Sequence, residues 1–123
     1  MPRGLSENTK EEVKNYIDYT ILPEYKKRVE TEIEYSDNSP DTYYATVDLK
    51  ISISTAEELK NTLKMVEERM KQSPYNIQMW LVITTKNTTL ITALGSEFDD
   101  YTITLQGHRY KYNSLDEIPT DLF

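Results

Sequence analysis

The stretch Tyr43–Met70, YYATVDLKISISTAEELKNTLKMVEERM, decides the fold. Its first part, Tyr43–Ile53, alternates apolar and polar residues, and this period of two predicts a strand with one buried face. Its second part, Thr55–Met70, spaces apolar residues three and four apart, which predicts a helix with one buried stripe. The inward strand positions are Tyr43, Ala45, Val47, Leu49, Ile51 and Ile53, and the helix stripe is Leu59, Leu63, Val66 and Met70. Because each apolar surface needs a partner, the helix is expected to cover one face of the sheet.

The segments before this unit predict a helix and a strand. Val13, Tyr16, Ile17 and Ile21 form an apolar stripe at helical spacing, and Pro23 ends that helix. Residues 25–36 fit a helix at period four and a strand at period two. We choose the strand for the second half, because it is β-branched and is followed by the turn signal Asp37–Asp41.

The segments after this unit predict a succession of strands. Capping at Ser54 with Glu57, or at Thr55 with Glu58, starts the long helix, and Ser73-Pro74 ends it. Strands are predicted at Tyr75–Thr85, Thr88–Leu94, Tyr101–Leu105 and His108–Tyr112, with a tight turn at Gln106-Gly107 and one helical turn at residues 114–117.

These elements predict one α+β domain over residues 1–123, with residues 1–5 and 120–123 loosely attached. The order is α-β-β-α-β-β-β-β, and the short turns favour a mostly antiparallel sheet of about five to six strands. The long amphipathic helix lies on one face. The N-terminal helix is expected on the other, over Trp80 and Val82, which make that side of the Tyr75–Thr85 strand unusually apolar.

Composition excludes several classes of function. The chain has 14 Lys and Arg against 21 Asp and Glu, a net charge of −7, which argues against direct binding to nucleic acid or to an anionic membrane. It has no cysteine, and thus no disulfide or zinc thiolate site. No stretch has the apolar length of a membrane span or of a signal peptide. A cytoplasmic protein is expected.

A row of glutamates is the first candidate site. If residues 29–36 form a strand, Glu30, Glu32 and Glu34 share one face at about 6.8 Å spacing, and Asp48 lies on the same face of the neighbouring strand. A rigid acidic face of this kind can imitate a nucleic-acid backbone and occupy a basic groove. The alternative is a solvated strand face that deters edge aggregation, and Lys50 on that face would offset part of its charge.

Trp80 and Tyr44 form the second candidate, on the face opposite the long helix. Exposed there, they would serve as interface anchors, since Trp and Tyr are enriched in binding hot spots. The alternative, which we expect for Trp80, is burial under the N-terminal helix. For Tyr44 both readings stay open.

Two further candidates are weaker. The loop Gly95–Asp100 has three carboxylates that suit a hard cation, but its spacing is not that of a calcium-binding EF-hand, and an acidic turn explains it equally well. His108 with Arg109 and Lys111 suggests a general base beside an anion site, but no orienting acid or reacting partner is identifiable. We predict no catalytic residue, metal or cofactor.

The function expected is therefore that of a non-enzymatic acidic protein that presents a sheet face to a basic protein surface. The partner-binding residues would be Glu30, Glu32, Glu34, Tyr44, Asp48 and Trp80. In its sharpest form this is a nucleic-acid mimic that inhibits a nuclease or another nucleic-acid enzyme, encoded by a virus or mobile element. The alternatives are a small-molecule-binding domain or small enzyme with a pocket lined by Tyr43, Tyr75 or Tyr101 between sheet and helix, and a structural or assembly subunit.

Overall fold

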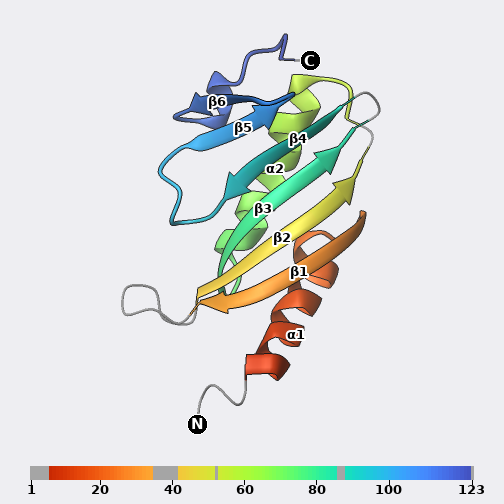
Figure 1. Ribbon diagram of the computed structural model, residues 1–123, viewed down its shortest axis with the longest axis vertical. Helices are drawn as coiled ribbons and strands as arrows, with labels where there is room; N and C mark the ends of the chain where they lie inside the picture. Colours follow the sequence, from red (N-terminus) through yellow and green to blue (C-terminus); the bar gives the residue numbers. More distant parts are fainter. Residues whose placement is uncertain (1–5, 35–41, 52, 86–87, 123) are drawn as a thin grey trace.

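The computed structural model is a twisted sheet with both α-helices on one side (Figure 1). It describes residues 6–34, 42–51, 53–85 and 88–122. The elements in chain order are α1 (Ser6–Tyr16), the π-helical segment η2 (Ile17–Ile21), β1 (Lys26–Glu34), β2 (Thr42–Lys50), α2 (Ala56–Lys71), β3 (Asn76–Thr84), β4 (Thr89–Leu94), β5 (Tyr101–Leu105), β6 (His108–Tyr112) and the 3-10 turn η3 (Leu115–Glu117). This confirms the predicted α+β class and the order of its main elements.

The sheet has six strands in the order β1-β2-β3-β4-β5-β6. All neighbouring pairs are antiparallel except β2 and β3, which run parallel. The parallel pair arises because α2 carries the chain back to the end of the sheet where β2 began, as parallel strands require. The sheet is thus mostly antiparallel, as predicted.

The inward face of β2 and the stripe of α2 form the centre of the core. Ala45, Val47 and Leu49 are buried against α2, whose buried residues are Ala56, Leu59, Leu63 and Val66. Met70, predicted in the stripe, is only partly buried. Thr55 caps α2, its hydroxyl oxygen accepting a hydrogen bond from the Glu58 amide at 3.2 Å. The predicted burial of Leu59, Leu63 and Val66 and the Thr55 cap are therefore confirmed, and the fully buried stripe begins at Ala56 in the first turn of α2.

The expected position of the N-terminal helix was wrong. Val13, Ile17 and Ile21 are fully buried in the same core as α2, and α1 lies behind β1 on the side of the sheet that α2 occupies (Figure 1). Trp80 and Val82, its expected seat, are only half-buried on the other side of the sheet. Width explains the difference. A sheet of six strands at about 4.8 Å spacing is about 24 Å across, whereas one helix covers about 10–12 Å, so one face accommodates two helices.

Polar contacts fix the N-terminal helix to this face. The Arg69 guanidinium of α2 donates to the Ile21 carbonyl at 2.9 Å and to both carboxylate oxygens of Glu24 at 2.9 and 2.8 Å. The Lys27 ammonium, with a side chain only 8% exposed, donates to the carbonyls of Asp18 at 3.1 Å and Tyr25 at 3.0 Å. A cation is favoured at a helix C-terminus, where carbonyls lack partners.

The strand predictions hold with shifted ends. The segment left open between helix and strand is strand β1, starting at Lys26; the predicted turn Asp37–Asp41 lies outside the described residues. β2 ends at Lys50 rather than Ile53, because the chain must leave the sheet to reach the cap of α2. β5 and β6 match their predicted ranges. Gln106 and Gly107, at φ 52° and 82°, form the predicted two-residue turn between them.

The residues after β6 also contribute to the core: Leu115 and Ile118 are buried, and Leu122 is partly buried against the same cluster. In the described parts of the chain, no helix is long and apolar enough to cross a membrane.

Candidate functional site: the open face of the sheet

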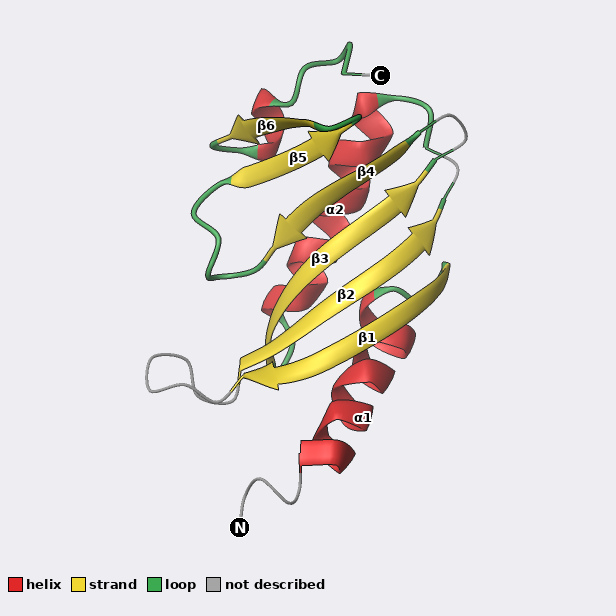
Figure 2. Cartoon of the chain, in the orientation of Figure 1, coloured by secondary structure: helices red, strands yellow, loops and turns green. Residues whose placement is uncertain are grey.

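The side of the sheet away from α1 and α2, called here the open face, is not covered by either helix (Figure 2). Its exposed side chains include Thr46, Asp48, Lys50, Thr84, Thr89 and Ile91 of the central strands and, by the register of the sheet, Arg109 and Lys111 of the edge strand β6. Ile91 is 42% exposed and pairs in register with the half-buried Val82. The face therefore presents both polar and apolar side chains to solvent.

The glutamate row lies on the edge strand of this sheet. In the antiparallel register, Glu30 pairs with Thr46, Glu32 with Tyr44 and Glu34 with Thr42. The side chains of these three glutamates lie outside the described part of the structure, so their mutual arrangement remains a prediction.

The register also divides the charges of β1 and β2. Asp48 pairs with Arg28, and Lys50 with Lys26, whereas the glutamate positions all lie toward the start of β2. In these two strands the three glutamate positions pair with the first half of β2, and the basic positions Lys26 and Arg28 pair with its second half, where Asp48 also lies. The end of the sheet where β2 begins is called here the acidic end. Asp48 was expected on the face of the three glutamates, with Lys50 offsetting part of the charge there; the register adds Arg28, whose position pairs with Asp48.

Three aromatic rings meet at the acidic end of the open face. Trp80 stacks with Tyr44, with ring centroids 5.7 Å apart at 28°, and meets Phe98 edge-on at 5.6 Å and 76°. All three side chains are half-buried, so this aromatic cluster (Tyr44, Trp80 and Phe98) has both a packed and a solvent-facing side. The Tyr44 hydroxyl donates to the exposed Glu97 carboxylate, at 2.6 and 2.9 Å from its two oxygens.

A buried amide holds the loop that carries Phe98 and Glu97. Gln78 of β3 is fully buried, and its carbonyl oxygen accepts a hydrogen bond from the Glu97 amide at 2.9 Å. Its Nε2 donates to Asn76 at 2.9 Å and to the Ser96 hydroxyl at 3.2 Å. Gly95 allows the Gln78 side chain to lie this close to the loop. Its φ is 149°, and a Cβ there would lie 2.1 Å from the side-chain oxygen Oε1 of Gln78. The loop is thus clamped onto the open face.

Two of the three carboxylates in the predicted cation loop Gly95–Asp100 have partners within the protein. Glu97 accepts from Tyr44, and Asp100 lies 3.6 Å from the Lys111 ammonium of β6. Among the residues that the structure describes, no three His, Asp or Glu side chains converge as metal ligands.

The residues around His108 do not form a joint site. His108, Arg109 and Lys111 are exposed on the edge strand β6. Successive residues of a strand point to opposite faces, so His108 and Arg109 are directed apart. The arrangement offers no convergence of a base with an anion-binding group.

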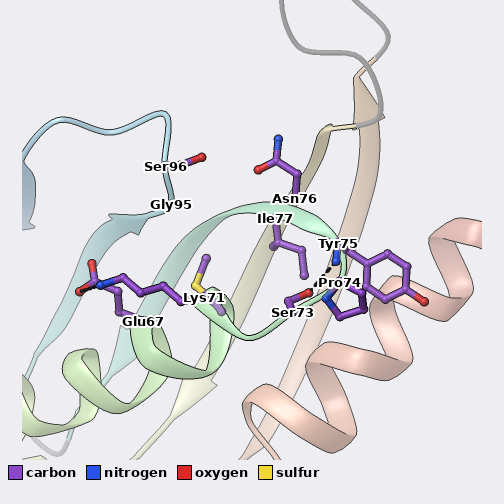
Figure 3. Close-up of a pocket in the computed structure, with 10 residues that line it drawn as sticks. Glu67, Lys71, Ser73, Pro74, Tyr75, Asn76, Ile77, Gly95 and Ser96 are labelled. Atoms are coloured by element: carbon purple, nitrogen blue, oxygen red, sulfur yellow. Dashed lines mark hydrogen bonds and ion pairs between the residues drawn. The ribbon is translucent and has the colours of Figure 1, made fainter.

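A separate pocket of about 440 Å³ lies where the end of α2, the start of β3 and the start of the 95–100 loop meet (Figure 3). Glu67 and Lys71 stand on one side of it, Asn76 and Ser96 on another, and Tyr75 beside them. The other lining residues are Met70, Ser73, Pro74, Ile77 and Gly95.

Of the three tyrosines that suggested a pocket, only Tyr75 lines this one. Tyr43 packs edge-on against Tyr75, with ring centroids 5.9 Å apart. Tyr101 donates a hydrogen bond to the Glu67 carboxylate at 2.6 Å. Burial, with that hydrogen bond, raises the pKa of Tyr101 to about 12, so its hydroxyl stays protonated and holds Glu67 in place.

Comparison with protein-family models, with curated proteins and with solved structures finds no significant match for this chain.

Sequence reasoning paired Tyr44 with Trp80 but missed Phe98 and Glu97 as part of the same surface. Glu97 is 53 positions from Tyr44, and the contact depends on the β2–β3 register and on the loop clamp. The one local signal was the loop composition, which suggested a cation site instead.

Proposed function

We propose that this protein is a non-enzymatic binding protein whose open face engages a basic protein surface. The observation that carries the proposal is that both helices pack on one side of the sheet, which leaves the aromatic cluster on the other side half-exposed. Trp and Tyr are the residues most enriched in interface hot spots. The glutamate positions of β1 and the Glu97 carboxylate border this cluster at the acidic end.

The charge distribution supports a basic partner. The net charge of −7 opposes association with another acidic surface and speeds the encounter with a basic one. A surface that normally holds nucleic acid, such as the groove of a nuclease, is basic. We therefore propose an inhibitor that occupies such a groove as the sharper form of the function.

The test is capture of nucleic-acid enzymes by the wild-type protein and by a variant with Glu30, Glu32 and Glu34 changed to Gln. Loss of capture, with wild-type binding that weakens steeply in salt, is the expected result. A matched control changes Glu57, Glu68 and Glu117, which are exposed on the helix side, to Gln, so the net charge changes equally. Equal binding by both variants would refute the assigned face.

The pocket beside Tyr75 favours a second candidate, the binding of a small molecule. A volume of about 440 Å³ falls within the range of ligand sites, and its lining combines apolar walls with a few polar groups. A ligand would raise the melting temperature of the wild-type protein and not that of Met70→Trp, a variant that fills the pocket. A metabolite library that shifts neither protein would leave this candidate without support.

A further inference from the structure

We infer that the anchor of the partner on the open face is an arginine side chain, held over the aromatic cluster and against the Glu97 carboxylate. This inference rests on the proposed function and adds to it the chemistry of one contact.

The aromatic rings supply the first half of an arginine site. Trp80 and Tyr44 are stacked at 28°, and neither side chain is fully buried. Trp is the strongest cation–π partner among the side chains, and a planar guanidinium stacks on such a ring. Phe98, packed edge-on against Trp80, holds the indole in place.

The carboxylate supplies the second half. Glu97 is exposed and lies at the hydroxyl end of the Tyr44 ring, 2.6 Å from that hydroxyl. A carboxylate carries a full negative charge and about four acceptor positions, so hydrogen bonds within the protein do not remove its attraction for a guanidinium. A guanidinium over the Trp80 and Tyr44 rings is then within reach of the Glu97 carboxylate. The cation–π attraction and the charge attraction therefore act on the same guanidinium.

The loop geometry makes the site rigid before any partner arrives. Gln78 binds the Glu97 amide and the Ser96 hydroxyl from below the loop, and Lys111 lies 3.6 Å from Asp100 at the other end. A rigid site loses little conformational entropy on binding. The paired flat ring and fork-like carboxylate match a guanidinium better than the compact, strongly hydrated ammonium of lysine.

The experiment uses Trp80 as its own reporter, because it is the only tryptophan in the chain. The full-length protein is titrated with hexa-arginine and hexa-lysine peptides while its emission is recorded. We expect the arginine peptide to shift or quench the emission and to bind more tightly than the lysine peptide. Glu97→Gln, which keeps an acceptor for Tyr44, should weaken arginine binding about five-fold, as loss of one exposed ion pair predicts.

Glu68→Gln is the matched control, since it removes the same charge from an exposed position on α2. Equal weakening by both variants, or arginine binding without any change in Trp80 emission, would overturn the arginine anchor. If the Glu30, Glu32 and Glu34 variant alone loses peptide binding, the proposed function stands and the anchor fails. If neither peptide binds the wild-type protein, both fail.

Discussion

Substitution of Gly95 by Ala should destabilise the protein more than any other single methyl addition at a glycine of its described residues. The Cβ would lie 2.1 Å from the Gln78 carbonyl oxygen and 2.8 Å from its Cδ, far inside contact distance. The buried amide must then move, and it cannot move without breaking its bonds to Ser96 and to the Glu97 amide.

The cost has two parts. A residue other than Gly at φ 149° is strained by about 1–3 kcal/mol. A buried polar group left without its partner costs about 1–3 kcal/mol. The free energy of unfolding should therefore fall by about 2–6 kcal/mol, a large fraction of the 5–15 kcal/mol typical of a domain.

Urea unfolding followed by Trp80 emission measures this loss. Gly107→Ala is the matched control: its φ is 82°, but no atom lies within 4 Å of the added Cβ, so only about 1–2 kcal/mol of backbone strain is expected. Adding Gln78→Ala to Gly95→Ala should restore part of the loss, because it removes the clashing amide. If Gly95→Ala costs no more than Gly107→Ala, the clamp does not hold the loop.

Three other substitutions test the packing and charges of the fold. Leu63→Ala, in the fully buried stripe of α2, should lower the free energy of unfolding by about 2–5 kcal/mol in urea denaturation. Glu24→Gln should destabilise the protein at neutral pH and not in acid. The hydrogen bond from Arg69 lowers the pKa of Glu24 in the folded state, so the stabilisation that the Glu24 carboxylate contributes is present above its unfolded-state pKa. That stabilisation disappears as the pH falls through the folded-state pKa. A urea midpoint difference that persists in acid would contradict this. Tyr101→Phe should remove one tyrosine that ionises near pH 12 in an ultraviolet titration. Because folding raises the pKa of Tyr101 from 10.0 to about 12, the stabilisation that the protonated Tyr101 hydroxyl gives the folded state is fully present below pH 10. It is lost as the pH rises through 12.

The secondary structure was predictable because it depends on local period. The alternation of apolar and polar residues predicted both ends of β5 and of β6 correctly. Helical spacing with a capping signal predicted each end of α2 to within one residue. The position of α1 was not predictable in the same way. An amphipathic stripe such as Val13 with Ile17 requires burial, but it does not specify which face of the sheet provides it.

The candidate site was predictable only in part, for a similar reason. The outward positions Tyr44 and Trp80 follow from the period of their strands, and they come together in the parallel register of β2 and β3. Phe98 and Glu97 reach them through Gln78 and Gly95, whose contact spans 17 positions of sequence and leaves no periodic signal. Contacts made by loops across a sheet are set by tertiary structure.

The parallel β2–β3 pair also determines how the molecule should come apart. It joins the β1–β2 hairpin to the β3–β6 meander, and α2 is the covalent link between these two antiparallel units. Breaking it exposes the core beneath both helices, whereas the edge strands β1 and β6 can fray while the centre stays closed. Amide hydrogens at the β2–β3 seam should therefore exchange with deuterium only through global unfolding, and those of β6 through local opening. The seam joins residues that are 34 positions apart in the sequence, such as Thr42 and Asn76, so its formation should limit the folding rate.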